Sequence, residues 1–403
     1  MTDTDRQPAY RWVILGAAAV MLALSMGQLV NGLTAFFYPL EQEFGWRRGD
    51  IALINTAGVA GLAIGGILIG RLSDRIGIRP ILLAGASVLG LCVLAASRAE
   101  SLWQLYALFF VAGMFGGAAF FAPVVAMVGN WFVVGSGMAL GIASAGQAVG
   151  QGAIPWVTAL LIEDFGWRGA FATLGVATLA ILIPLALLTR EPPRPAVGSP
   201  GAAGGGQAVP LSYWTVVVVL GAAVVGCCTL MSVPLMHLVP LMQGRGIEAS
   251  DAGGVMFAML TAGIFGRLFF GKLADIAGAV PAYMTASAWQ TLMVFGFTFF
   301  ETLDAFYLYA LFYGFGYAGV MTGVLTTTRA LTTPDRRASA MGVVGAAAWV
   351  GHGIGGFMGG ALFDVTGDYA APFAVAAAAG VANLTIMAGL WFGIRRRSAP
   401  VAA

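Results

Sequence analysis

Long apolar stretches alternate along this chain with short clusters of charged residues, a pattern that predicts a bundle of membrane-spanning helices. A helix that crosses a bilayer needs about 20 predominantly apolar residues, and the stretches have about that length. Strict alternation of apolar and polar residues, typical of a membrane β-barrel, is absent from the sequence. The twelve predicted helices cover residues 12–38, 51–71, 80–97, 102–127, 137–162, 169–189, 213–242, 252–273, 280–300, 305–328, 338–363 and 370–394.

The composition supports an all-α membrane protein embedded in a lipid bilayer. Of the 403 residues, 59% are hydrophobic and 9% are charged, whereas a soluble domain carries roughly 25% charged residues. So few charges cannot cover a water-facing surface, and nucleic-acid binding is not expected. Cys92, Cys227 and Cys228 lie inside apolar stretches, where we expect small core residues and no disulfide framework. The first stretch is too long for a cleaved signal and is expected to be a retained helix.

The distribution of Lys and Arg predicts the orientation of the chain. When alternate loops are assigned to opposite sides, one side holds fourteen of these residues and the other holds five. Positive charge accumulates on the cytoplasmic side of membrane proteins. Both termini are therefore predicted to be cytoplasmic, in a multi-pass protein of the inner (plasma) membrane.

The two halves of the sequence are related to each other. GRLSDRIGIRP at 70–80 corresponds to GKLADIAGAVP at 271–281, and residues 137–152 correspond to residues 338–353, both at an offset of 201 residues. Between the halves lies 190–211, a segment rich in Pro, Gly and Ala that reads as a flexible linker.

We therefore predict two six-helix bundles joined by a cytoplasmic linker. Such a parallel repeat is typical of carriers that hold their substrate at mid-membrane and work by alternating access. The predicted parts are an N-terminal bundle (1–189), the linker (190–211) and a C-terminal bundle (212–403).

GRLSDRIGIRP resembles the loop between helices 2 and 3 of the major facilitator superfamily, whose pattern is Gly-x-Leu-Ala-Asp-Arg-x-Gly. Further stretches resemble the branch of monocarboxylate transporters and bacterial oxalate/formate antiporters: WF at 131–132 followed by GMALGIASAGQAVGQ, FGWRGAF at 165–171, and GIFGRLFFGKLAD at 263–275. The resemblance extends over nearly the whole chain. It implies the major facilitator fold and a transporter of small carboxylates.

The sequence departs from this branch at several positions. Monocarboxylate transporters place a lysine in helix 1, where this chain has Asn31, and an aspartate four residues before the helix 8 arginine, where it has Gly263. Drug antiporters carry a Gly-Pro pair in helix 5, but here Gln151 follows Gly150. These departures put the family's proton partner in doubt and weaken the hypothesis of drug efflux.

Arg267 is the one charge that the sequence places well inside a predicted helix. Burying a guanidinium costs several kcal/mol unless it is paired or faces a water-filled cavity. A substrate carboxylate, held by two parallel hydrogen bonds, would be a suitable partner. The alternative is a structural arginine that reaches the cytoplasmic face and is satisfied by carbonyls and hydroxyls. Its position matches the family's helix 8 arginine, which favours substrate binding.

Aromatic residues are the next candidates for the substrate site. Tyr313 and Tyr317 are four residues apart and share a helix face. The resemblance aligns both with pocket aromatics of the oxalate carriers, and it aligns Phe121 in the same way. Composition alone favours a packing or lipid-facing role for the two tyrosines, and the resemblance reverses this; the Phe121 ring offers only packing and serves either the site or the core.

Polar residues in three further helices complete the predicted site. Asn31, Gln147 and Gln151 are costly to expose to lipid and are expected to point inward. His352 corresponds to Gln151 in the repeat and is either a proton relay or a hydrogen-bonded packing residue. Trp349 precedes His352 by three residues and would line the same cavity.

The helix 2–3 loop is predicted to act in gating. Gly70 and Gly77 permit close packing and a turn, and Asp74 can accept hydrogen bonds from the N-terminus of a neighbouring helix. Arg75 belongs to the same motif. Asp275 repeats the aspartate in the second half, but the arginine is not repeated, so the second loop is expected to be degenerate.

The sequence lacks a phosphate-binding loop, a clustered set of metal ligands and a nucleophile–base pair, so we predict no enzyme activity, no metal and no cofactor. We predict a monomeric secondary transporter of a small monocarboxylate, coupled to a proton. The alternatives are an organic-anion exchanger, proton-driven efflux of an apolar drug-like molecule, and a non-transporting sensor.

Overall fold

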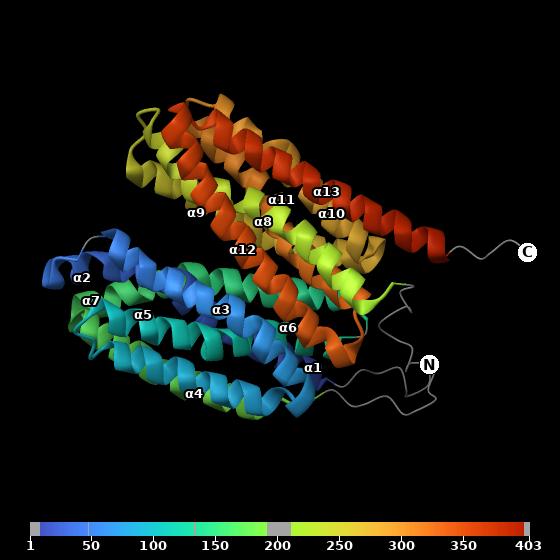
Figure 1. The fold of residues 1–403 in the computed structure, drawn as a ribbon. Coiled ribbons are helices and arrows are strands. Elements are labelled where there is room, and N and C mark those ends of the chain that lie inside the picture. Colours follow the sequence, from blue (N-terminus) through green and yellow to red (C-terminus); the bar gives the residue numbers. More distant parts are fainter. Residues whose placement is uncertain (1–8, 47, 133, 192–210, 399–403) are drawn as a thin grey trace, which may run out of the picture. The chain divides into compact units, whose positions relative to one another are not determined.

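The computed structural model describes residues 9–46, 48–132, 134–191 and 211–398, which form an almost entirely helical protein (Figure 1). No β-strand occurs in these ranges. Ten helical stretches within them are long and apolar enough to cross a membrane. The all-α, multi-pass architecture predicted from the sequence is confirmed.

Two features explain why ten stretches correspond to twelve predicted spans. Helix α7 (Ser136–Leu188) joins the predicted spans 137–162 and 169–189, and Gly166 breaks it with a backbone at φ 70° and ψ 170° that only glycine adopts readily. Helix α10 (Ala279–Val294) is shorter and continues into a 3₁₀ turn, Phe295–Phe299. Every predicted span is therefore helical, although these boundaries differ from the prediction.

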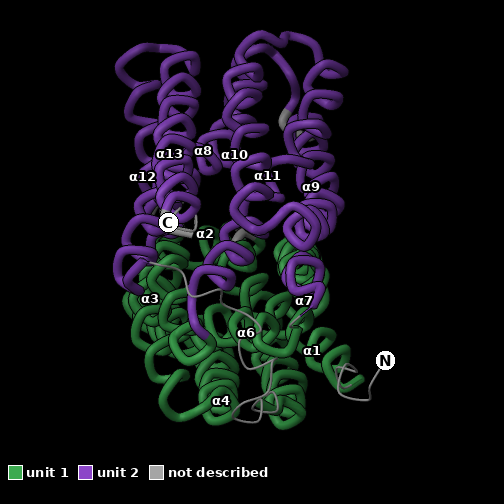
Figure 2. Tube along the Cα trace, turned by 90° about the vertical axis from the view of Figure 1, so that its right-hand side faces the viewer, with its two compact units in different colours: residues 1–133, 142–202, 334–346 green, residues 134–141, 203–333, 347–403 purple. Residues whose placement is uncertain are grey.

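The chain forms two compact units (Figure 2). Unit 1 comprises residues 1–133, 142–202 and 334–346, and unit 2 comprises residues 134–141, 203–333 and 347–403. The beginning of α7 thus belongs to unit 2, and the beginning of α12 (Arg337–Thr366) belongs to unit 1. Most of the predicted linker, from residue 192 to residue 210, lies outside the described residues.

Unit 1 contains two helices that are widened by π-helical turns. These turns, Gly27–Asn31 and Ala112–Gly117, directly follow α1 and α5. The side-chain amide of Asn55 donates to the carbonyl oxygens of Val30 at 2.6 Å and Leu29 at 3.3 Å. These bonds provide donors for two backbone carbonyl groups of the first π-helical turn. The helices of this unit are α1 (Tyr10–Met26), α2 (Phe37–Phe44), α3 (Arg48–Ile76), α4 (Ile78–Ala96), α5 (Leu102–Val111), α6 (Ala118–Trp131) and most of α7.

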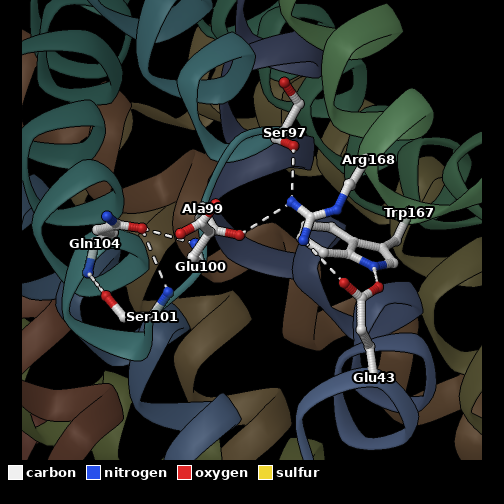
Figure 3. Close-up of polar contacts among 8 residues, drawn as sticks. All are labelled: Glu43, Ser97, Ala99, Glu100, Ser101, Gln104, Trp167 and Arg168. Atoms are coloured by element: carbon white, nitrogen blue, oxygen red, sulfur yellow. Dashed lines mark hydrogen bonds and ion pairs between the residues drawn. The ribbon is translucent and has the colours of Figure 1, made fainter.

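A polar cluster fastens the end of α2 to the break in α7 (Figure 3). The Glu43 carboxylate accepts hydrogen bonds from the Trp167 indole and, at 2.8 Å, from the Arg168 guanidinium. Arg168 also donates to the carbonyl oxygens of Ser97 and Ala99 at 3.3 and 3.1 Å. The bonds from Trp167 and Arg168 hold the pKa of Glu43 below its ordinary value, against the opposing effect of partial burial. We call these three side chains the Glu43 cluster.

Unit 2 contains a buried polar network. Asn383, which is fully buried, accepts a hydrogen bond from the Tyr283 hydroxyl at 2.7 Å and donates to Ser287 Oγ at 2.5 Å. The network joins α10 to α13, because its members come from both helices. The other helices of this unit are α8 (Tyr213–Gln243), α9 (Ala249–Ala277), α11 (Leu303–Leu331), most of α12, and α13 (Ala370–Ser398).

Candidate functional site

Arg267 lies in the middle of α9 and is buried, with 9% of its surface exposed. The preceding residue, Gly266, lets α9 approach α11 closely, since a Cβ at Gly266 would lie 1.9 Å from the carbonyl oxygen of Phe315. Arg267 is thereby close enough to Tyr317 of α11 for an electrostatic interaction. Arg329 and Arg337 are also buried, but both lie at helix ends.

Tyr313 and Tyr317 form an aromatic pair on the buried face of α11. Their ring centroids are 5.8 Å apart and their planes are inclined by 28°. Phe297 meets the Tyr313 ring edge-on at 5.0 Å. The Tyr313 hydroxyl is fully buried and has no hydrogen-bond partner within the described part of the chain. A buried donor left in this state is costly, so an acceptor from a ligand or water would stabilise the site.

His352 and Trp349 lie together on α12 in unit 2. Their rings are 5.8 Å apart, and both residues are half-buried. His352 Nδ1 lies 3.1 Å from the carbonyl oxygen of Ala348, and the backbone oxygen of His352 accepts a hydrogen bond from Ser232. When Nδ1 carries the proton and donates to Ala348, Nε2 of the neutral ring is left as an acceptor.

The other predicted site residues belong to unit 1. Asn31 ends the first π-helical turn and donates to the backbone oxygen of Gln151 at 3.1 Å. Gln147 and Gln151 are half-buried on α7. Phe121 is buried on α6 and faces the beginning of α12, where a Cβ at Gly345 would lie 3.1 Å from the Phe121 ring. Thus the structure joins Asn31 to Gln151, whereas Phe121 packs against a different helix.

Asp74 and Asp275 each bind the N-terminus of a helix. Asp74 accepts hydrogen bonds from the backbone amides of Ala338 and Ser339, at 3.2 and 2.8 Å, and from the Ser339 hydroxyl. Asp275 accepts from the amides of Gly137 and Met138, at 2.7 and 2.9 Å. Bonds from helix-terminal amides to a carboxylate are favourable in both charge and geometry. The second loop, which we expected to be degenerate, therefore keeps the aspartate contacts.

Glycines repeat this arrangement in both units. A Cβ at Gly70 would lie 2.5 Å from the carbonyl oxygen of Ala338, and a Cβ at Gly271 would lie 2.5 Å from that of Gly137. Gly77 and Gly278 make the turns after these helices with φ of 85° and 94°. Arg75 is exposed. Residues 201 positions apart therefore make equivalent contacts in the two units, in addition to being similar in sequence.

Two polar residues that the sequence analysis overlooked lie inside the units. Asn55 satisfies the π-helical turn next to Asn31. Gln290 on α10 is fully buried, and neither polar atom of its side chain has a hydrogen-bond partner in the described ranges. In both cases the available signal was an amide side chain in the interior of a predicted span.

A family model described as the Major Facilitator Superfamily matches residues 13–327 and 218–403 of the chain. Among curated proteins, the chain is similar to Monocarboxylate transporter 13 of Rattus norvegicus, with 27% identity over 91% of this chain and 86% of the relative. It is also similar to Monocarboxylate transporter 2 of Homo sapiens, with 25% identity over 89% of this chain and 80% of the relative.

Solved structures of transporters share the fold. The proton:xylose symporter XylE, bound to 6-bromo-6-deoxy-D-glucose, aligns with a TM-score of 0.75 and 13% identity, over 95% of this chain and 96% of the symporter. The human organic anion transporter MFSD10 aligns with a TM-score of 0.73 and 16% identity, over 94% of this chain and all of that protein (100%). At such identities the likeness concerns the fold alone.

Proposed function

Because this chain belongs to the Major Facilitator Superfamily, we propose that it carries a small monocarboxylate across the membrane by alternating access. The names of its curated relatives support this substrate class. In this proposal the two bundles predicted from the sequence, 1–189 and 212–403, are the parts that move during transport. The protein works as a monomer in the inner membrane, with both termini in the cytoplasm.

The observation that carries the proposal is a buried arginine beside buried tyrosines. Arg267 is ten residues from the end of α9, deep in an apolar helix, and it interacts with Tyr317. Tyr313, stacked on Tyr317, adds a buried hydroxyl donor. A carboxylate would receive charge-assisted hydrogen bonds from the guanidinium, which are stronger than bonds between neutral groups. One central cation favours one carboxylate, since a second anionic group would be left uncompensated.

The remaining predicted residues are assigned supporting roles in this proposal. Asn31, Gln147 and Gln151 would supply polar contacts, and Phe121 and Trp349 would supply packing. His352 would carry a coupled proton, and the alternative is exchange of two organic anions without a proton. Efflux of an apolar drug-like molecule is a further alternative.

The gating role is proposed for the two aspartates and their neighbours. The contacts of Asp74 and Asp275 at helix N-termini would hold one state of the transport cycle, and they must break in the other. Gly70 and Gly77 would permit the close approach and the turn, while Arg75 would contribute positive charge at the loop.

Uptake into reconstituted vesicles tests the substrate site. Arg267→Lys should lower uptake of short 2-hydroxy and 2-oxo monocarboxylates about tenfold or more, because an ammonium cannot make the planar pair of hydrogen bonds. That loss corresponds to about 1.5–3 kcal/mol for a hydrogen bond to a charged group. Arg98→Lys, at an exposed position, is the matched control.

Near-normal uptake by Arg267→Lys would show that the arginine is structural or acts through its charge alone. A thermal-shift screen separates the substrate classes, because a ligand stabilises the protein that binds it. Stabilisation by neutral drug-like compounds, without stabilisation by carboxylates, would overturn the proposal in favour of efflux.

A further inference from the structure

Three apolar spans of unit 1 have one of their ends at the same patch of side chains. The first span begins at Tyr10, the span that contains α5 and α6 ends at Trp131, and α7 ends at Leu188. The Tyr10 hydroxyl donates to the carbonyl oxygen of Leu188 at 2.6 Å. The Trp131 indole donates to the carbonyl oxygen of Arg190 at 2.9 Å. Because apolar spans end at the surface of the bilayer, this patch lies at the level of the lipid head groups.

The patch is rich in aromatic rings. Trp12 on α1 is 54% exposed, although its side chain is large and apolar, and its ring centroid lies 5.4 Å from that of Phe132. The centroids of Tyr10 and Trp131 are 6.0 Å apart. Trp and Tyr are enriched at membrane–water interfaces, where the ring meets lipid and the polar atom meets water. The aromatic residues are therefore a second, independent reason to place the patch at the interface.

Two guanidinium groups lie over these rings. The guanidinium carbon of Arg11 is 5.4 Å from the centroid of the Trp12 ring and 5.3 Å from that of Phe132. The guanidinium carbon of Arg190 is 4.9 Å from the centroid of the Tyr10 ring. A guanidinium held over an aromatic ring is restricted in orientation, and its planar set of N–H donors matches the oxygens of a phosphate. Arg190 is exposed and Arg11 is half-buried, so both can be approached from the surface.

The acidic residue that follows Arg190 in the sequence does not neutralise it. Glu191 Oε1 lies beside the turn between α3 and α4, 2.5 Å from the position that a Cβ at Gly77 would take. Within the described ranges, no carboxylate forms an ion pair with Arg190. The patch therefore presents positive charge at the bilayer surface, and an anion is its complement.

From these observations we propose that the patch binds the head group of an anionic phospholipid. Arg11 and Arg190 would donate hydrogen bonds to the phosphate, and the rings of Tyr10 and Trp12 would pack against the glycerol and the upper acyl chains. A zwitterionic lipid has the same phosphate but brings a cation with it, so it should bind more weakly to two arginines. The bound lipid would reinforce the link between α1 and α7 that the Tyr10 hydroxyl already makes. This site goes beyond the proposed transport function and does not depend on it.

Thermal unfolding of the purified full-length protein in a neutral detergent measures this binding, because a ligand stabilises the protein that binds it. The additives are dioleoyl phosphatidylglycerol, dioleoyl phosphatidylcholine and inorganic phosphate. The anionic lipid should reach half of its maximal stabilisation at about a tenfold lower concentration than the zwitterionic lipid, because both arginines contribute to the attraction. Inorganic phosphate should give no shift at the same concentrations, since it lacks the acyl chains.

Two double variants locate the site. Arg11→Gln combined with Arg190→Gln should remove most of the difference between the two lipids. Arg98→Gln combined with Arg396→Gln removes the same charge at two exposed positions and should leave the difference unchanged. If the first double variant folds poorly, Arg190→Gln alone, at an exposed position, should weaken the effect of the anionic lipid about fivefold.

Three results would overturn the proposal. Equal stabilisation of the wild type by the two lipids would show that the head-group charge is not recognised. Equal losses in the two double variants, or no loss in Arg190→Gln, would show a nonspecific attraction that does not involve this patch. Stabilisation by inorganic phosphate at the same concentrations as the anionic lipid would indicate a site for a free anion.

Discussion

The Glu43 cluster makes a prediction about stability that can be worked out from its contacts. Glu43→Ala removes the acceptor of two hydrogen bonds. Trp167 is 5% exposed, so its indole N–H would be left buried without this partner, at a cost of about 1–3 kcal/mol. The pair with Arg168 is 42% exposed on both sides and adds only about 0.2–1 kcal/mol. We therefore expect a loss of about 1–4 kcal/mol.

The substitution Glu43→Gln separates charge from hydrogen bonding. The amide oxygen can still accept from one donor, so the loss of stability should be smaller than for Glu43→Ala. The pKa of Glu43 is lower in the folded protein than in the unfolded chain. Its contribution is therefore complete above the ordinary carboxyl pKa of about 4.3 and is lost as the pH falls through the folded-state value.

Apparent melting temperatures of the purified protein, measured from about pH 2.5 to pH 8 by tryptophan fluorescence, test both statements. At pH 7 the order should be wild type, then Glu43→Gln, then Glu43→Ala, and the gap between wild type and Glu43→Gln should stay constant down to the ordinary carboxyl pKa of about 4.3 and narrow below it. Glu100→Gln changes the same charge at an exposed side chain and serves as control. A melting temperature of Glu43→Ala equal to that of the wild type, or a gap independent of pH, would refute this reasoning.

Three further substitutions give distinct outcomes. Asp74→Asn should weaken the contact with α12 by about 0.3–1 kcal/mol through the lost charge, and hydrogen exchange at the Ser339 amide should become faster while transport slows; unchanged exchange would contradict the contact's role. His352→Gln should abolish accumulation driven by an inward pH gradient and spare counterflow exchange, and accumulation that persists would remove His352 from the coupling. Asn383→Leu should destabilise the protein by about 1–3 kcal/mol in thermal melts, because the Tyr283 hydroxyl loses its buried acceptor, and a neutral effect would show that the network adds little.

The spans could be read from the sequence because each is an apolar run long enough for a bilayer. The internal repeat added finer detail. Gly77 and Gly278 both make positive-φ turns, and Asp74 accepts the helix-terminal bonds that its motif predicted. These features depend on a few adjacent residues, so the local sequence contains the necessary information.

Other features depend on residues far apart in the sequence, so the hydropathy pattern could not predict them. The π-helical turn Gly27–Asn31 accepts a hydrogen bond from the Asn55 amide, which lies 25 residues along the chain from Val30. Arg337 was counted among the loop cations, yet it is 1% exposed and donates to the Asn130 side chain. A hydropathy pattern predicts that an arginine near the end of a span faces water. It takes no account of a hydrogen-bond partner 207 residues away along the chain.

The pairing within the candidate site was only partly foreseeable. The spacing of Tyr313 and Tyr317 correctly predicted a shared helix face. The proximity of Arg267 to Tyr317 arises from Gly266, whose missing side chain brings α9 against α11. Gly266 is one of 58 glycines in the sequence, and nothing in the sequence indicates which helix it would meet.

Each unit contains a segment from the other half of the chain, and this affects how the protein could be split into two fragments. Unit 1 requires residues 334–346 from beyond the central linker, and unit 2 requires residues 134–141 from before it. A fragment ending in the linker would lack residues 334–346. In the intact chain this segment packs against Gly66 and Gly70 through Gly342 and Ala338. Two co-expressed fragments, by contrast, would supply both segments: the N-terminal fragment carries residues 134–141 and the C-terminal fragment carries residues 334–346. Split versions of this protein should therefore be recovered as a noncovalent pair and should not accumulate as stable separate halves.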